Sequence, residues 1–173
     1  MLSVDLERFY ELLGILAAQP GQCRALSEYT GRSDWPERGV YFFREPGEHR
    51  SGLPGGSRIV RVGTHGVSGG SKSSLLGRLR AHRGSLDGGG NHRGSIFRLH
   101  VGAALLARDR EVIEELPTWA KGSSAPRLIR ANEAAHERRV SEKIGAMSVL
   151  WVDVPDDPGP GSRRAYIEFE SCG

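Results

Sequence analysis

Apolar residues that recur at steps of three and four positions predict several amphipathic helices along this chain. In residues 4–18, Phe9, Leu13 and Leu16 are among the apolar positions that fall at these steps, and Pro20-Gly21 ends the pattern. Similar spacing and local capping residues mark the other candidates. The predicted helices cover residues 4–18, 22–29, 74–83, 95–108, 131–146 and a last segment that begins near residue 163.

Runs of β-branched and aromatic residues predict three strands. They read GVYFF, RIVRVG and SVLWVDV, at residues 39–43, 58–63 and 148–154. The first two are expected to pair antiparallel, although the glycine-, proline- and charge-rich connection over 45–57 is too long for a tight turn. Residues 109–130 stay ambiguous, because two prolines interrupt any long element there.

Length and composition limit the classes of protein that fit. The chain has 173 residues, which predicts one domain, and 38% apolar residues together with 24 glycines are enough to bury a core. No run of about 18 apolar residues predicts a membrane span. The acidic positions near the N-terminus do not fit an export signal. The two cysteines, Cys23 and Cys172, are expected to be reduced thiols of a cytoplasmic protein.

The distribution of charge along the chain suggests a class of binding partner. Residues 58–110 contain ten Lys or Arg against two Asp, a net charge of +8 in a chain whose total is +3. The same segment holds four of the six histidines. Such a concentrated block suggests a polyanion partner, because Lys and Arg neutralise phosphates and release counterions. A solvated basic surface explains the charge alone about equally well.

Two common phosphate and metal motifs do not fit. A P-loop requires glycine before its lysine, but Ser71 precedes Lys72, so at most the helix that starts near Ser74 would hold one phosphate with Lys72 beside it. Neither cysteine has a neighbouring cysteine, and the histidines lack the spacing of a zinc site. The sequence therefore does not predict nucleotide hydrolysis or a zinc centre.

A third pattern resembles the GIY-YIG nuclease superfamily. GVY at 39–41, RVG at 61–63 and RLRAH at 78–82 follow in the family's order, with Glu168 on the helix after the third strand. The resemblance covers about residues 39–170 and implies an α/β (α+β) fold with a small three-stranded antiparallel sheet flanked by helices. Residues 1–38 would then be an N-terminal helical extension, and residues 39–173 the nuclease domain.

The resemblance also implies a DNA endonuclease that depends on Mg²⁺ or Mn²⁺. Tyr41 would accept or relay the proton of the attacking water, and Arg78 would hold the scissile phosphate through its planar guanidinium. His82, four residues later on the same helical face, would polarise or protonate groups near the site. Glu168 would bind the metal ion, which in proteins takes few carboxylates together with water and phosphate oxygens.

Further basic side chains are expected to contact the nucleic acid. The candidates are Arg61, His65, Lys72, Arg80, Arg83, His92 and Arg93. Of these, His92 and Arg93 follow Asn91 in the glycine-rich stretch DGGGNHRG, which taken alone fits a solvated connection slightly better than a loop facing nucleic acid. The acidic and basic residues of the helix over 131–146, Glu133 and Glu137 among them, are expected to form surface pairs.

The chain departs from the family pattern in three places. Arg61 stands where the family's second motif has tyrosine, residues 42–60 form a longer gap than usual, and the sequence given stops five residues after Glu168. These departures motivate two alternatives to the endonuclease. One is a nucleic-acid-binding module without catalysis on the same fold, and the other is a protein-interaction domain whose basic surface meets an acidic partner.

Overall fold

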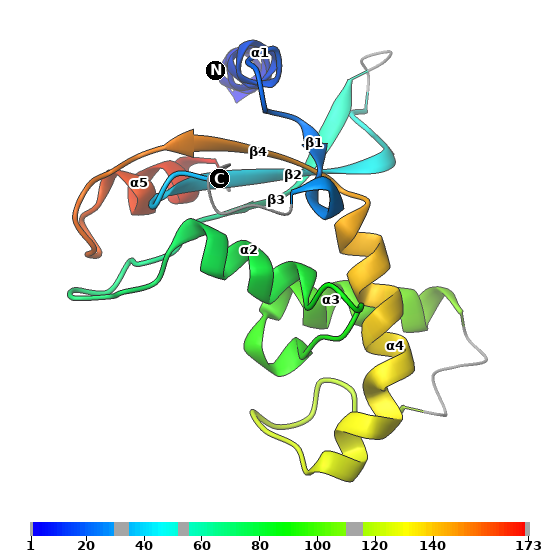
Figure 1. The fold of residues 1–173 in the computed structure, drawn as a ribbon. Coiled ribbons are helices and arrows are strands. Elements are labelled where there is room, and N and C mark those ends of the chain that lie inside the picture. The colour runs from blue at the N-terminus through cyan, green and yellow to red at the C-terminus, as the bar shows by residue number, and fades with distance from the viewer. Residues whose placement is uncertain (1, 30–34, 52–55, 110–115, 172–173) are drawn as a thin grey trace. The chain divides into compact units, whose positions relative to one another are not determined.

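A computed structural model describes residues 2–29, 35–51, 56–109 and 116–171 (Figure 1). The chain forms two compact units, and each is described by itself. Unit 1 consists of Met1–Leu76 and Met147–Gly173, and unit 2 of Gly77–Ala146. Within the described residues, no helix is both long and apolar enough to cross a bilayer. Cys23 is a free thiol, whereas Cys172 lies outside the described residues.

Unit 1 is built on an antiparallel sheet of four strands in the order β1-β4-β2-β3. The strands are β1 (Arg24–Ala25), β2 (Gly39–His49), β3 (Ser57–Gly63) and β4 (Ser148–Asp153). The three predicted strands are confirmed, and β2 runs past residue 43 into the segment expected to be a loop. The α/β class is confirmed as well, with β1 as an additional short strand.

The predicted helix over 22–29 was wrong. This segment contains β1 and a short 3-10 helix, η1 (Leu26–Glu28). The backbone amides of Cys23 and Leu26 donate to the carbonyl oxygens of Val149 and Met147 at 3.1 and 2.9 Å. Pairing with β4 therefore satisfies the backbone groups that a helix would have satisfied internally.

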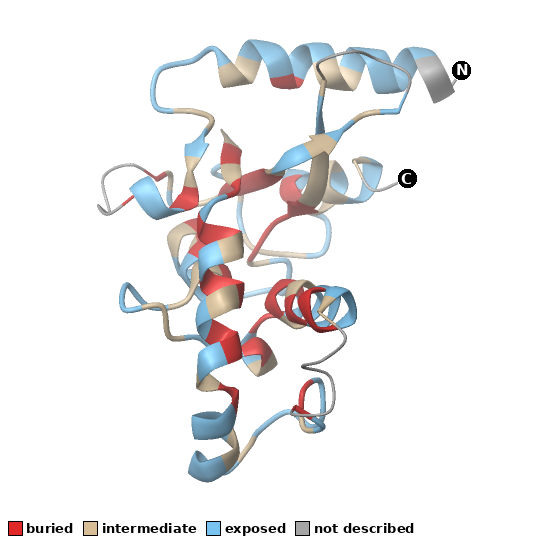
Figure 2. Ribbon diagram, turned by 90° about the vertical axis from the view of Figure 1, so that its right-hand side faces the viewer, coloured by how far each residue is buried: buried red, intermediate tan, exposed pale blue. Residues whose placement is uncertain are grey.

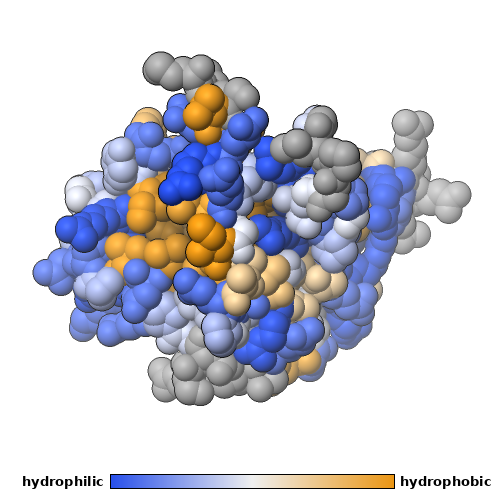
Figure 3. Space-filling view, turned by 90° about the horizontal axis from the view of Figure 1, so that it is seen from above, coloured by the Kyte–Doolittle hydropathy of each residue, from blue (hydrophilic) through white to orange (hydrophobic). Residues whose placement is uncertain are grey.

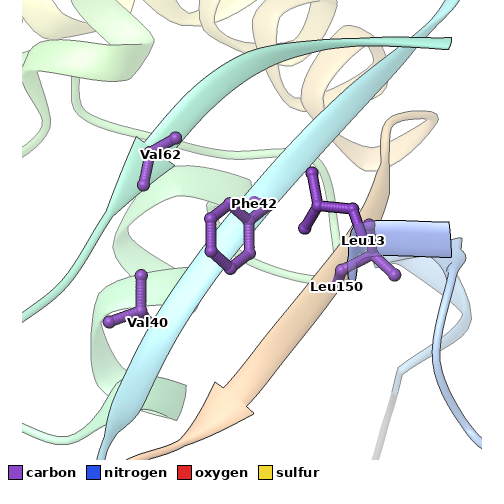
Figure 4. Close-up of a cluster of buried hydrophobic side chains, with 5 residues drawn as sticks. All are labelled: Leu13, Val40, Phe42, Val62 and Leu150. Carbon is purple, nitrogen blue, oxygen red and sulfur yellow. The ribbon is translucent and has the colours of Figure 1, made fainter. Parts of the chain in front are cut away.

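One face of the sheet carries an apolar core. Because side chains alternate along a strand, Val40 and Phe42 of β2 point to the same face as Val62 and Leu150. Leu13 of helix α1 (Leu2–Ala17) completes this buried cluster, as Figure 4 shows. Helix α1 and strand β1, which both precede residue 39, thus belong to the same core and sheet as the motif strands.

The second helix of unit 1, α5 (Arg163–Glu170), packs Ile167 against this cluster. An apolar groove of about 320 Å³ lies on the same part of unit 1, and Figure 3 shows hydrophobic residues gathered on that side. Its lining includes Phe9, Leu12 and Leu16 of α1, Phe42 and Val152 of the sheet, and Ile167.

Unit 2 is helical. It contains the end of α2 (Leu75–Arg83), the short helix η2 (His92–Gly94), α3 (Ile96–Arg108) and α4 (Arg127–Gly145), of which α3 and α4 pack together. The Ser95 side chain caps α3 by accepting a hydrogen bond from the Arg98 amide. The predicted helices near 74–83, 95–108 and 131–146 are confirmed. Buried residues follow one side of α4 (Figure 2), and several of them are charged.

Candidate functional site

The GVY and RVG segments lie side by side in the sheet. Tyr41 of β2 is the direct antiparallel partner of Gly63 of β3. A Cβ atom on Gly63 would lie 2.3 Å from the Tyr41 hydroxyl oxygen, closer than any real contact allows. Glycine is therefore required at position 63 because the tyrosine ring crosses the neighbouring strand there. Tyr41 itself is 0% exposed.

Residues just after RVG hold the start of β2. The Thr64 hydroxyl donates to the Gly39 carbonyl oxygen at 2.9 Å, and the Gly39 amide donates to Nε2 of His65 at 3.4 Å. Because Nε2 accepts, the proton of His65 is assigned to Nδ1, which donates to the Ser73 carbonyl oxygen at 3.0 Å. These bonds fix the end of the sheet where both motif glycines lie.

This arrangement argues against the expectation that His65 contacts nucleic acid. Its side chain is buried and uses both ring nitrogens within unit 1. Its carbonyl oxygen accepts a further bond from Nη1 of Arg164 at 2.9 Å. Such a set of contacts gives His65 a positioning role at the end of β3.

Arg164 and Asp156 form an ion pair that the sequence did not indicate. The Arg164 side chain is fully buried, and its Nε donates to the Asp156 carboxylate at 2.6 Å. Burial would raise the pKa of Asp156, but the bonds from Arg164 and from the Arg163 amide outweigh it and lower the pKa. The pair connects the start of α5 to His65 at the end of β3.

Glu168 lies on α5, one turn beyond Arg164. Its neighbour Ile167 packs on the face of the sheet that carries Val40 and Phe42, whereas Tyr41 points to the opposite face. Glu168 is half-buried, and none of the described residues forms a hydrogen bond or an ion pair with its carboxylate. Tyr41 and Glu168 are thus in the same unit but are not hydrogen-bonded to each other.

Two predicted basic contacts also belong to unit 1. Arg61 lies opposite Phe43 and so shares the face of Tyr41; its Nε is buried and has no hydrogen-bond partner among the described residues. Lys72 is exposed in the loop before α2. Both cations are therefore available to an anionic ligand, although no contact in the structure tests that role.

The remaining predicted residues lie in unit 2. Arg78 and Arg80 are on α2, half-buried and exposed respectively, and form no ion pair within the described part of the chain. Burial, followed by the charge of Arg80, lowers the pKa of Arg83. Because Tyr41 and Arg78 belong to different units, their meeting in one site stays a prediction.

His82 is an interior residue of unit 2. Its side chain is 0% exposed, and Nδ1 is 2.7 Å from the hydroxyl oxygen of Ser95, while the ring packs edge-on against Phe97. The His82 carbonyl oxygen accepts a bond from Nη1 of Arg98 at 2.9 Å. These contacts favour a positioning role, and direct catalysis by His82 stays a prediction.

His92 and Arg93 do not form the solvent-facing loop that the glycine-rich stretch suggested, and this expectation was wrong. Nδ1 of His92 lies 2.9 Å from the Glu137 carboxylate, and the ring stacks on Trp119 with centroids 3.8 Å apart. Arg93 forms a two-pronged pair with Glu133 at 2.6 and 2.9 Å. Both side chains are almost fully buried, so contact with nucleic acid is not the role the structure gives them.

Glu133 and Glu137 were likewise expected at the surface, and this was wrong because both are buried. The Glu137 carboxylate accepts hydrogen bonds from the buried guanidinium of Arg98 and also pairs with Nδ1 of His92. Burial would raise the pKa of Glu133, but hydrogen bonds from Arg93 and Thr118 outweigh it and lower the pKa. Sequence spacing gave no signal for either pair, because the partners lie about 40 residues apart.

The side chains present limit how a divalent metal ion could be held. The described part of the chain contains no group of three or more His, Cys, Asp or Glu that would enclose a metal. Glu168 fits a less demanding site, because its carboxylate has no partner among the residues that the structure describes and Mg²⁺ commonly takes one or two carboxylates plus water and phosphate oxygens. The donor set is thus compatible with a magnesium ion held mainly by its substrate and solvent.

A comparison with family models identifies the family to which the paired motifs belong. The model described as GIY-YIG domain matches residues 2–173, almost the whole chain. The chain belongs to the GIY-YIG family. No curated protein and no solved structure matches it.

Members of the GIY-YIG family are endonucleases, and such nucleases act on DNA. In this GIY-YIG domain the two motif segments are adjacent strands, and the glycine of the second provides the space for the tyrosine of the first. The match also includes residues 2–38, consistent with the place of α1 and β1 in the core and sheet of unit 1.

Proposed function

We propose that this GIY-YIG domain is an endonuclease that hydrolyses DNA phosphodiester bonds with the help of a divalent metal ion. The observation that carries the proposal is the pairing of Tyr41 with Gly63. The tyrosine ring of the first motif lies over the glycine of the second motif, on one face of the sheet. The match over residues 2–173 adds the nuclease class.

Cations of both units are the proposed phosphate contacts. Helix α2 begins at Leu75, whose amide donates to the Glu37 carbonyl oxygen at 3.0 Å, and Arg78 follows within one turn. The Arg78 guanidinium has no internal partner among the described residues, so it is available to bind two phosphate oxygens at once. Arg61 and Lys72 supply further positive charge in unit 1.

Glu168 is the proposed metal ligand. When bound, Mg²⁺ or Mn²⁺ would supply a positive charge against the phosphate oxygens. The Tyr41 hydroxyl is the proposed acceptor of the proton from water. Because Tyr41 is fully buried, the proposal requires that its hydroxyl becomes accessible when DNA binds.

The test is cleavage of supercoiled and branched DNA with Mg²⁺ or Mn²⁺ and with EDTA. We expect metal-dependent nicking that Tyr41→Phe and Glu168→Gln each reduce about 10²-fold or more. Tyr166→Phe and Glu170→Gln are matched controls on α5, because both side chains are exposed, and they are expected to keep wild-type rates. Equal rates in the wild type and Tyr41→Phe would contradict the assignment of Tyr41.

A second candidate is a nucleic-acid-binding module without catalysis. It is favoured by the complete burial of Tyr41 and His82 and by Arg61 in place of the second tyrosine. This candidate predicts DNA binding that Arg78→Ala weakens, with no cleavage in either metal. Cleavage that is lost in Glu168→Gln would exclude it.

A further inference from the structure

The arginines of α4 fall into two groups. Arg139 is paired with Asp109 across unit 2. In contrast, Arg127, Arg130 and Arg138 are exposed, and none of them forms a hydrogen bond or ion pair with the described residues. Unpaired arginines cost little at a surface, but three on one helix provide donors that the fold of unit 2 does not use.

These three arginines share one flank of α4. Positions 127, 130 and 138 are separated by three and eight residues, spacings that keep side chains on one side of a helix. Ala131 and Ala134 lie between them and leave the guanidinium groups unobstructed. We call Arg127, Arg130, Ala134 and Arg138 the α4 flank. The neighbouring side of the helix is held inside unit 2 by Glu133 and Glu137.

A polar pocket of about 340 Å³ lies against the middle of the α4 flank. Arg130, Ala134 and Arg138 line it on α4, and Gly89 and Gly90 line it on the glycine-rich loop. A Cβ on Gly90 would lie 1.9 Å from Nη2 of the buried Arg98, so this loop is shaped by the guanidinium that it covers.

The two acidic residues of this pocket are engaged in other bonds. The Glu137 carboxylate is held by Arg98 and His92. The Asp87 carboxylate accepts bonds from the Ser85 hydroxyl at 2.5 Å and the Gly89 amide at 3.1 Å, and these bonds, with a smaller contribution from the charge of Arg138, lower its pKa. Arg130 and Arg138 form no hydrogen bond or ion pair with the described residues, so their guanidinium groups are the groups of the pocket that remain available.

We propose that the α4 flank binds consecutive phosphates of one nucleic-acid strand. The helical rise places Arg130 and Arg138 about 12 Å apart along α4. A duplex strand presents a phosphate about every 3.4 Å of its axis, so this length of helix faces several phosphates. The inference rests on the proposed function for its ligand class, and it adds a contact surface outside the residues that the motifs indicate.

The first test is the salt dependence of DNA binding, measured in EDTA so that no cleavage occurs. Wild type and the triple variant Arg127→Gln/Arg130→Gln/Arg138→Gln are titrated against a labelled duplex of about 20 base pairs. Three lost phosphate contacts should lower the slope of log K against log salt by about 2.7. Between 50 and 200 mM salt, wild-type affinity should then fall about 40-fold more than that of the variant.

A matched triple variant separates local contact from overall charge. Arg8→Gln/Arg24→Gln/Arg163→Gln removes the same charge from exposed positions of unit 1. We expect its slope to stay within about one contact of the wild type. If both triple variants lower the slope equally, the effect is one of net charge and the assignment to α4 is overturned.

A single substitution gives a sharper test. Ala134→Glu places a carboxylate four residues from both Arg130 and Arg138, where it should pair with them and occupy the pocket. Asn132→Glu is the control, because it adds a carboxylate at an exposed position of α4 that has no arginine three or four residues away. Weaker DNA binding in Ala134→Glu alone supports the proposal, and equal binding by the two variants overturns it.

Two further outcomes keep this inference separate from the proposed function. An α4 effect on binding in a protein that never cleaves DNA would support the inference and contradict the endonuclease. Metal-dependent cleavage together with wild-type salt slopes in every α4 variant would support the endonuclease and contradict the inference. Competition by inorganic phosphate as strong as by a single-stranded oligonucleotide at equal phosphate concentration would also overturn binding to a strand.

Discussion

The cluster between α1 and the sheet in unit 1 is made of apolar side chains, whereas the interior between α3 and α4 in unit 2 adds buried ion pairs to its apolar residues. On the sheet, Val40, Phe42 and Leu150 exclude water without any polar partner. Between α3 and α4, Arg98 and Glu137 are buried together and satisfy each other. Burying charge is costly unless it is paired and hydrogen-bonded, so the second interior depends on every member being present.

This difference predicts how the stability of each unit should respond to substitution. Removing an apolar group from unit 1 leaves a cavity, whose cost depends on how well the neighbours close it. Removing one partner from unit 2 leaves a buried charge without compensation. Trp119 lies in unit 2, and Trp35 and Trp151 lie in unit 1, so fluorotryptophan NMR during urea unfolding reports each unit separately.

The largest effect is expected for Glu137→Leu in unit 2. It leaves Arg98 buried without a carboxylate, which should lower the free energy of unfolding by about 3–5 kcal/mol. The Trp119 resonance should follow this loss. Glu142→Gln, an exposed change on the same helix, should stay within about 0.5 kcal/mol of the wild type. Equal stability of the two variants would show that the ion pair is dispensable.

The corresponding change in unit 1 is Leu150→Ala. Leu150 is fully buried in the apolar cluster, so we expect a loss of about 2–5 kcal/mol, detected at Trp35 and Trp151. Leu128→Ala, at an exposed position of α4, is the control and should cost less than about 0.5 kcal/mol. If Leu150→Ala costs no more than Leu128→Ala, the comparison between the two interiors fails.

A smaller effect is expected where Tyr41 crosses its neighbouring strand. Gly63→Ala forces a methyl group against the tyrosine ring and should cost about 1–3 kcal/mol of unfolding free energy. Gly14→Ala on α1 has open space and should instead stabilise the protein by about 0.5–1 kcal/mol. Thermal unfolding of the two variants measures both signs, and stabilisation by Gly63→Ala would contradict the close approach.

The smallest effect concerns protonation inside unit 2. Burial lowers the pKa of His136, whose Nε2 donates to the Gly102 carbonyl oxygen at 3.0 Å. The unfolded chain therefore binds a proton below pH about 6.5 more readily than the folded one, and stability falls as pH drops. One such group gives a slope of at most about 1.4 kcal/mol per pH unit.

The variant His136→Gln should flatten the stability profile at pH values below about 6.5, where the unfolded histidine binds its proton, and urea midpoints at successive pH values measure it. His100→Gln is the matched control, because His100 is exposed on α3. A profile that keeps its slope in His136→Gln would assign the pH dependence to another group.

The sequence predicted the elements whose apolar spacing directly reflects burial. Residues 39–43, 58–63 and 148–154 form strands because their β-branched and aromatic residues fit a pleated, half-buried surface. The resemblance to the family also placed GVY and RVG on adjacent strands. The segment over 22–29 was missed because its structure depends on hydrogen bonds to β4, which lies more than 120 residues away.

The buried charges could not be found in the same way. Charged residues are almost always exposed, so Glu133 and Glu137 on a charged helix were expected at the surface. The stretch DGGGNHRG was similarly interpreted as a solvated loop. In the structure, Gly90 leaves room for Arg98, and this requirement is visible only once the two segments are together. The burial of proposed site residues likewise depends on tertiary contacts that spacing does not encode.

The position of β4 within the sheet has a consequence for the order of folding. This strand lies between β1 and β2, yet it follows both by about 100 residues or more. During synthesis, the β2–β3 hairpin and the contiguous residues 77–146 leave the ribosome before β4 exists. The edge of β2 that pairs with β4, and the whole of β1, therefore stay unpaired until β4 emerges. In that interval the nascent chain exposes strand edges to which chaperones or other chains can bind.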